Sequence, residues 1–288
     1  MRKARLKASL QEPVAHYHCI SRIVDRRFVL GDLEKEQFIA IMRHYERFCG
    51  VSVITYCILD NHFHLLVEVP RMPDPDQLPD DQELVRRVGS AGGSFESRSL
   101  KADLQRFRRE GNHQAAEALR QRYFHMMWDI SWFLRLLKQR FTQGYNANHA
   151  RTGTLWEGRF RSVLVEGGGA ALGVIAAYID LNPLRAGIVH DPKDYRWSGY
   201  GEAVGGGKLA QAGLKRAAEA LFGAAGSSAS LFSDPPFENL RDKDLPLRTI
   251  NSSIQLDSAN CGRKSMVNER HSVARLIRHN KEAGIVCV

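Results

Sequence analysis

Two histidines in a short apolar stretch are the residues of this chain best suited to chemistry. They are His62 and His64, in the run Asn61-His62-Phe63-His64-Leu65-Leu66-Val67. The run reads as a β-strand, and successive strand side chains point to opposite faces, so the two imidazoles share one face and Phe63 takes the other. Two imidazoles side by side on a rigid strand can bind a divalent metal ion. A bare His-x-His pair is more often two polar residues on a solvated face, so the metal interpretation needs support from elsewhere.

That support is the segment Tyr178-Ile179-Asp180-Leu181-Asn182-Pro183. Tyr178 stands near the end of an apolar helical pattern that Pro183 is expected to stop. Residues four apart on a helix lie on the same face, so the Tyr178 hydroxyl and the Asn182 amide point the same way. Taken alone, the tyrosine is more simply a core residue and the asparagine a helix end. The combination with the histidine pair favours a site.

Five sequence blocks in a fixed order contain these residues. The blocks are His16-Tyr17-His18-Cys19-Ile20, the run from Cys57 to Val67, Gly153-Thr154-Leu155-Trp156-Glu157-Gly158-Arg159-Phe160-Arg161, the run from Tyr178 to Val189, and Tyr195-Arg196-Trp197-Ser198-Gly199-Tyr200. Together they resemble the HUH endonucleases (His-hydrophobic-His), and within them the single-tyrosine transposases, namely the REP-associated and IS200-like insertion-sequence enzymes. The resemblance covers residues 14–70 and 126–200. Asp60 departs from it, since relatives often carry proline there, but aspartate also suits a turn.

The resemblance implies an enzyme that nicks and rejoins DNA. Tyr178 would be the nucleophile and would form a 5′-phosphotyrosine, while His62 and His64 would bind Mg²⁺ or Mn²⁺ with Asn182 as a third ligand. The implied partner is single-stranded DNA beside a hairpin or palindromic repeat. Many insertion-sequence relatives are homodimers, whereas REP-associated ones act as monomers, so both states stay open. His16 and His18 could assist the tyrosine, although a structural role is favoured for both.

Charge agrees with a nucleic-acid partner. The chain has 41 Lys and Arg against 32 Asp and Glu, a formal net charge of +9, and an excess of basic residues favours polyanions. Basic residues interleave with aromatic ones between residues 120 and 161, as expected of a surface that tracks phosphates and stacks bases. The candidate contacts are Arg159, Arg161, Arg140 and Lys138. Arg159 and Arg161 flank Phe160 on an expected strand and would therefore share a face.

Other features bound the function class. No segment is long and apolar enough to span a membrane, and the five scattered cysteines form neither a metal knuckle nor a disulfide framework. The expected location is the reducing cytoplasm, with nucleoid association while the protein acts on DNA.

The elements that must position these residues form an α+β pattern, expected to be a ferredoxin-like antiparallel sheet backed by helices. Strands are expected at 14–24, 51–59, 62–69 and 155–165, and helices at 33–49, 130–141 and 170–181. The transposase domain is expected over 1–200, with a helical insertion at about 71–125 whose segment 89–99 reads as flexible. An alanine- and glycine-rich helix and linker would follow over 201–230, and a polar, partly basic tail of unknown role over 231–288.

Three functions remain open. The first is an active transposase, favoured because histidines, tyrosine and asparagine are all present. The second is a catalytically silent relative that binds hairpin DNA or RNA. The third is an unrelated metal-dependent hydrolase, which would normally need further ligands soon after the histidines, where Leu65-Leu66-Val67 supplies none.

Overall fold

The core of the protein is a four-stranded antiparallel sheet with strand order β2-β3-β1-β4. The structure is a computed structural model, and it describes residues 7–9, 12–165 and 170–222. The strands are β1 (Val14–Arg22), β2 (Ser52–Ile58), β3 (His62–Pro70) and β4 (Arg161–Val165). β1 lies in the middle and pairs with both β3 and β4, while β2 pairs with β3 as a hairpin.

Two long helices connect these strands on one face of the sheet. α1 (Asp32–Cys49) joins β1 to β2, and α4 (Ile130–Asn148) precedes β4. A β-α-β-β-α-β order with this strand arrangement is the ferredoxin-like topology, so the predicted α+β fold is confirmed. Inward-facing side chains of β1 and β3, such as Cys19 and Phe63, pack with Phe38 of α1 and Phe141 of α4 in one buried cluster.

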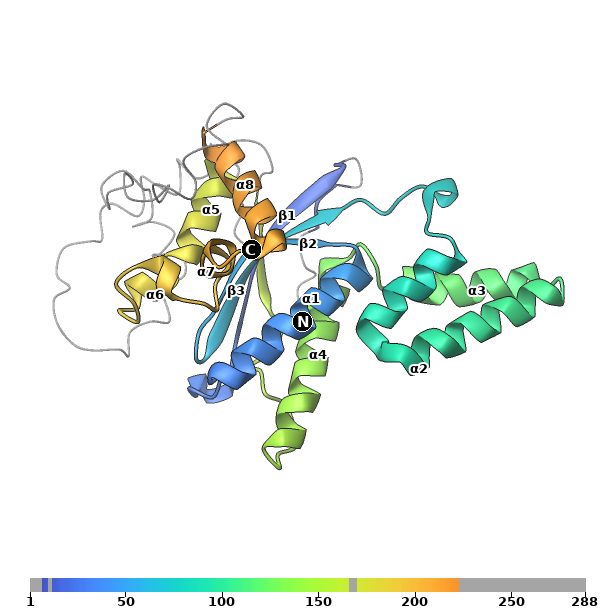
Figure 1. Ribbon diagram of the computed structural model, residues 1–288, viewed down its shortest axis with the longest axis horizontal. Helices are drawn as coiled ribbons and strands as arrows, with labels where there is room; N and C mark the ends of the chain where they lie inside the picture. The colour runs from blue at the N-terminus through green and yellow to red at the C-terminus, as the bar shows by residue number, and fades with distance from the viewer. Residues whose placement is uncertain (1–6, 10–11, 166–169, 223–288) are drawn as a thin grey trace, which may run out of the picture.

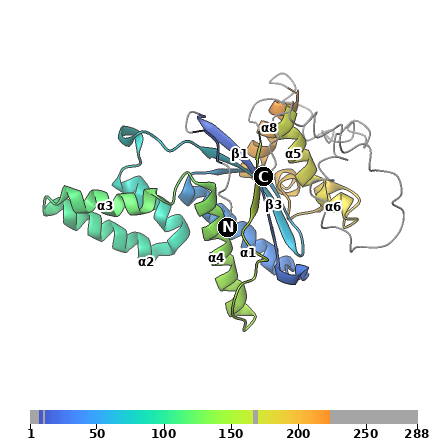
Figure 2. The same ribbon diagram turned by 180° about the vertical axis from the view of Figure 1, so that it is seen from behind.

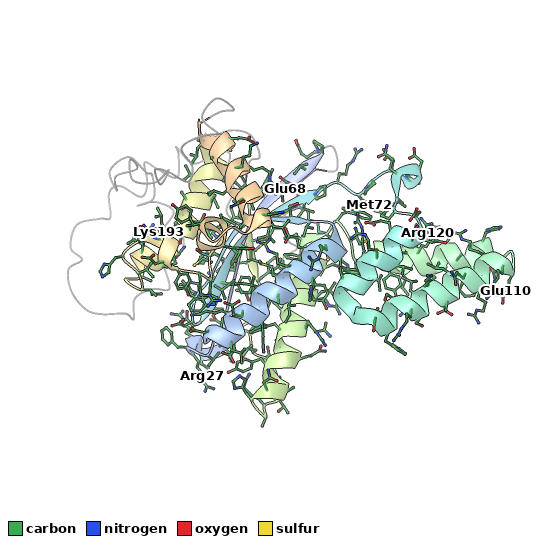
Figure 3. The ribbon with its side chains drawn as sticks, viewed as in Figure 1. Arg27, Glu68, Met72, Glu110, Arg120 and Lys193 are labelled. Carbon is green, nitrogen blue, oxygen red and sulfur yellow. The ribbon has the colours of Figure 1, made fainter. Side chains whose placement is uncertain are left out.

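The opposite face of the sheet is covered by the C-terminal helices. These are α5 (Ala170–Asp180), α6 (Asn182–Arg185), α7 (Gly199–Val204) and α8 (Lys208–Phe222). α5 and α8 pack on each other and on β2, and Leu66 and Val165 of the sheet share a second buried cluster with Ile175 and Ala217. Figure 1 and Figure 2 show α1 and α4 on one side of the sheet and α5 and α8 on the other.

Between β3 and α4 the chain forms a helical hairpin that projects from the sheet (Figure 1). It consists of α2 (Asp81–Arg109) and α3 (His113–Phe124), preceded by the short 3₁₀ turn η2 (Pro75–Gln77). The prediction of a flexible segment at 89–99 is wrong, because α2 runs through it with one break at Gly93 (φ 81°, ψ −175°). Leu84, Val88 and Leu100 are buried on both sides of that break, and their packing holds the helix across the glycines.

The strand expected over 155–165 is shorter than predicted, since β4 begins only at Arg161. Residues 155–157, before a gap in the pairing, contact both α4 and the end of β1. Trp156 is buried and its indole Nε1 donates to Thr142 Oγ1 of α4 at 2.9 Å. Its backbone forms an isolated antiparallel bridge with Ile23, just past β1, and the Glu157 N–H donates to the Arg22 carbonyl at 2.9 Å. Within the named strands, β1 therefore pairs with β4 only from Arg161 onward.

The alanine-rich helix expected within residues 201–230 is present as α8, and it packs closely on the sheet. A Cβ on Gly213 would lie 2.0 Å from the carbonyl oxygen of Ile54 in β2, and one on Gly173 of α5 would lie 2.1 Å from Leu221. Arg216 also bonds Glu68 of β3 at 2.6 Å. The tail at 231–288 lies outside the described residues. Within the described part, no helix has the length and apolarity needed to cross a membrane.

Candidate active site around Tyr178

The histidine pair lies on the face of the sheet that α5 covers. His64 stands opposite Ile20 of β1 and Cys57 of β2, and His62 stands opposite Arg22. The two imidazole rings have centres 5.1 Å apart. His64 is buried and His62 is partly exposed at the start of β3, so the pair extends from the protein interior toward solvent.

α5 brings Tyr178 onto the same face. Its ring meets the His64 ring edge-on with centres 5.9 Å apart, and the His18 ring likewise at 6.0 Å. Tyr178 is 3% exposed, so its phenol lies against the histidines rather than in solvent. The structure thus brings together Tyr178, His62 and His64, which the sequence placed in separate elements.

Asn182 lies one helical turn after Tyr178, where the chain passes into α6. Pro183 was expected to stop the helix, but α5 already ends at Asp180 and Pro183 lies in the first turn of α6. The backbone N–H that proline lacks has no intrahelical partner at that position, so the proline fits there without loss of a hydrogen bond. The Asn182 amide Nδ2 donates to the Tyr178 carbonyl at 3.0 Å. This bond turns the amide nitrogen toward α5 and leaves the side-chain oxygen as the atom able to bind a cation.

Burial sets the protonation of the site. It lowers the pKa of His62 to about 4 and of His18 to about 4, and it places the pKa of His64 well below the usual range, with the charges of His62, His18 and Arg22 acting in the same direction. The imidazoles are therefore neutral near pH 7 and keep a lone pair each. Burial also raises the pKa of Tyr178, against the opposing effects of Arg185, Asn182 and Arg22.

Two hydrogen bonds act on the ring nitrogens. His62 Nδ1 lies 2.6 Å from the side-chain oxygen of Asn61, and His64 Nδ1 lies 3.0 Å from His18 Nε2. An amide oxygen only accepts, so His62 Nδ1 carries the proton and the lone pair of His62 is on Nε2.

The donor set fits a divalent cation. Two neutral imidazoles and one carboxamide oxygen suit Mn²⁺, and Mg²⁺ less closely, and they leave positions open for substrate oxygens. Among the residues that the structure describes, no three His, Cys, Asp or Glu side chains are grouped to hold a metal. The third ligand expected from the sequence, the Asn182 oxygen, is a carboxamide and belongs to none of these residue types.

Comparison with known proteins agrees with the first part of this site. Residues 13–78 match the family model for IS200-like transposases. The match confirms the recognition made from the sequence motifs, and it covers His62 and His64 but ends before Tyr178. No curated protein matches the chain. Solved structures similar to it include a REP-associated tyrosine transposase bound to a REP hairpin. The two chains are 13% identical with a TM-score of 0.44, and the match covers 70% of this chain and 86% of that one. This similarity is too low to support any inference.

The candidate DNA-contacting residues divide into two groups. Arg161, the first residue of β4, stands opposite Ile20 and so lies on the histidine face of the sheet. Arg159 is exposed in the loop before β4, with the buried Phe160 between the two. The two arginines therefore do not share a strand face as predicted, although both lie exposed at the same end of β4.

Arg140 and Lys138 lie on α4, which covers the other face of the sheet. Arg140 is exposed there. Lys138 is 9% exposed, its ammonium donates to the Gly158 carbonyl at 2.8 Å and it lies 5.2 Å from the Trp156 ring centre. This geometry favours a role for Lys138 in holding the 153–160 segment on α4.

Two arginines at the site were not selected from the sequence. Arg22 is paired with His62 across β1 and β3, and the Arg185 guanidinium lies 5.6 Å from the Tyr178 ring centre. The alternation of β1 carries a signal for Arg22, because His18, Ile20 and Arg22 must share one face. That signal becomes useful only once β1 is known to be the neighbour of β3.

Proposed function

We propose that this chain is a metal-dependent single-stranded DNA endonuclease and strand transferase, with Tyr178 as its nucleophile. The observation that carries the proposal is the contact between the Tyr178 ring and His64, which places a phenol beside a neutral histidine pair. The IS200-like match of residues 13–78 supports the same class of reaction. The proposed substrate is single-stranded DNA beside a hairpin, which rests on the family resemblance.

In the proposed reaction, the Tyr178 oxygen attacks the scissile phosphorus. A P–O bond to tyrosine forms and the P–O3′ bond breaks, which leaves a 5′-phosphotyrosine and a free 3′-hydroxyl; the phenolic proton passes to solvent or to the leaving oxygen. A 3′-hydroxyl from another strand then reverses the chemistry and joins to the held 5′ end. Tyr178 thus preserves the phosphodiester energy between cleavage and rejoining.

The residues around Tyr178 have separable roles. Arg185 and Arg22 lower the pKa of the phenol against the effect of burial, and their positive charge also favours a phosphate at this place. His62, His64 and the Asn182 oxygen would hold Mn²⁺ or Mg²⁺, which when bound polarises a phosphate and neutralises developing charge. Arg161 and Arg159 would contact the DNA backbone at the edge of the sheet.

A denaturing gel tests the proposal. The protein is incubated with hairpin-containing single-stranded DNA from the flanks of its own gene, with Mn²⁺ or Mg²⁺, labelled in separate samples at the 5′ or the 3′ end. We expect a covalent protein–DNA band from the 3′-labelled strand, because a 5′-phosphotyrosine retains the downstream fragment. The 5′-labelled strand should give a free product that a polymerase can extend.

Variants decide the assignment. Tyr178→Phe and His64→Ala should abolish the band, whereas Tyr123→Phe in α3, away from the sheet, should retain it. Specific hairpin binding without cleavage under both metals would favour the alternative, a silent hairpin-binding relative. Cleavage that persists in Tyr178→Phe would exclude Tyr178 as the nucleophile.

A further inference from the structure

We infer that His18 is a positioning residue that fixes the tautomer of His64 and so presents the His64 Nε2 lone pair to a cation. The inference rests on the proposed function, because it assigns His18 a role toward the proposed metal site. His18 belongs to the His16-Tyr17-His18 motif of β1, to which the proposed function assigns no role.

The geometry of the contact is that of an in-plane hydrogen bond. His18 stands opposite Leu66, so His64 is its diagonal neighbour across β1 and β3, a position within reach of long side chains. His18 Nε2 lies 3.0 Å from His64 Nδ1, the ring planes differ by 20° and the ring centres are 5.3 Å apart. A face-to-face stack would not bring two nitrogens this close with the centres this far apart. The nitrogens instead face each other along the line between the centres.

One proton lies in this contact, and its owner decides what His64 can bind. Both residues are 2% exposed, and a contact of 3.0 Å between two ring nitrogens needs one N–H donor and one lone pair. If His64 Nδ1 donates, the lone pair of His64 is on Nε2 and can bind a cation. If His18 Nε2 donates instead, His64 must carry its proton on Nε2 and cannot.

The two histidines of the pair therefore have different supports. Asn61 presents to His62 an oxygen that can only accept a hydrogen bond. Only the His62 tautomer with its proton on Nδ1 can form this bond. His18 can accept or donate, so His64 is suited to a cation only when His18 carries its own proton on Nδ1. Metal-binding histidines commonly have such a partner on the second nitrogen, and its loss typically weakens metal affinity about 10- to 100-fold.

The first test is the tautomer of His64 in metal-free wild-type protein near pH 7, measured from the ¹⁵N shifts and long-range couplings of the imidazoles. We expect a protonated Nδ1 and an unprotonated Nε2 on His64, and an unprotonated Nε2 on His18. A His64 protonated on Nε2 would overturn the inference. This measurement needs neither a variant nor a metal.

The second test is Mn²⁺ binding by calorimetry. His18→Leu removes the acceptor, and His18→Gln restores an oxygen near the position of Nε2. We expect affinity to fall about 10- to 100-fold in His18→Leu, with recovery of most of it in His18→Gln. His16→Gln is the matched control, since His16 is on the same strand and face and contacts Glu68 instead.

The outcomes separate the two proposals. Folded His18→Leu with wild-type Mn²⁺ affinity and an unchanged His64 tautomer would contradict the role of His18. If His64→Ala binds Mn²⁺ as well as wild type, the metal site of the proposed function fails. In that case the tautomer of His64 in the wild-type protein still tests whether His18 accepts a hydrogen bond from His64.

Discussion

Tyr178 of α5 and His64 of β3 meet ring edge to ring face in the interior of the protein, with ring centres 5.9 Å apart. The family match that covers His64 ends at residue 78, so the tertiary structure supplies the link between the histidines and the tyrosine. Both residues are buried on one face of the sheet, and the histidine pair extends from them to the partly exposed His62.

Replacing Arg185 by glutamine should slow adduct formation. The guanidinium lowers the pKa of Tyr178, and its loss leaves burial less opposed, so a smaller fraction of the phenol ionises. We expect a loss of about 10-fold in the single-turnover rate, a change of about 1.4 kcal/mol in the barrier, with partial recovery in Arg185→Lys.

The same assay has a defined pH dependence. The pKa of Tyr178 is raised above 10, so the ionised fraction and the rate should both increase from pH 7 to 9 in wild type. Arg196→Gln is the control for Arg185→Gln and should keep the wild-type rate, since Arg196 is exposed and paired with Glu36. A rate that does not change between pH 7 and 9 would contradict phenol ionisation as the limiting feature.

Asp180 should make the fold less stable as pH rises. It is fully buried, accepts from Thr55 Oγ1 at 2.6 Å and from the Tyr200 backbone N–H at 3.1 Å, and burial raises its pKa to about 7. Since the folded pKa lies above the unfolded one, the native state holds the extra proton between pH 4 and 7. The contribution is fully present below pH 4 and is lost as pH rises through 7, by at most about 4 kcal/mol.

Urea unfolding of wild type and Asp180→Asn from pH 4 to 8 measures this contribution. The difference in unfolding free energy between the two should shift in favour of the variant as pH rises. Asp76→Asn, at an exposed position, should show no such shift. A pH-independent difference for Asp180→Asn would mean that the carboxyl is not protonated in the native state.

Gly213→Ala should destabilise the protein through α8. The added methyl would meet the Ile54 carbonyl at 2.0 Å, so α8 has to move off β2, at a typical cost of about 1–3 kcal/mol. Gly144→Ala in α4 is the matched control, because a Cβ there meets nothing within 4 Å. Alanine in that helix should stabilise by about 0.5–1 kcal/mol. Thermal unfolding of both variants checks the pair, and equal effects would contradict the close packing of α8.

A DNA-binding titration should distinguish Arg161 and Arg159, which are proposed to contact DNA, from Lys138, which is proposed to stabilise the fold. Arg161→Ala and Arg159→Ala should weaken binding of hairpin DNA and reduce the slope of log affinity against log salt by about 1 each. Lys138→Met should leave that slope unchanged and lower stability instead, because its ammonium bonds the Gly158 carbonyl. A reduced salt slope in Lys138→Met would show that this lysine reaches the DNA.

Much of the sheet could be predicted from the sequence, since β1, the β2–β3 hairpin and α1 carry clear period-2 and helical patterns. Two segments could not. The glycine-rich part of α2 reads as a loop because local propensity ignores the burial of Leu84 and Leu100 on either side of it. The gap in pairing between Trp156, whose backbone bridges Ile23, and Arg161, where β4 begins, has no local sequence signal, because nothing near Trp156 reveals that its indole bonds to α4.

The site divides in the same way. The sequence by itself determined that His62 and His64 share a strand face, and that Tyr178 and Asn182 lie one helical turn apart, because both relations follow from backbone periodicity. Only the tertiary structure decided that His18 bonds His64, that Arg22 and Arg185 flank the phenol, and that Lys138 is buried. These relations depend on strand register and on which helix covers which face, and both are decided by contacts between residues far apart in the chain.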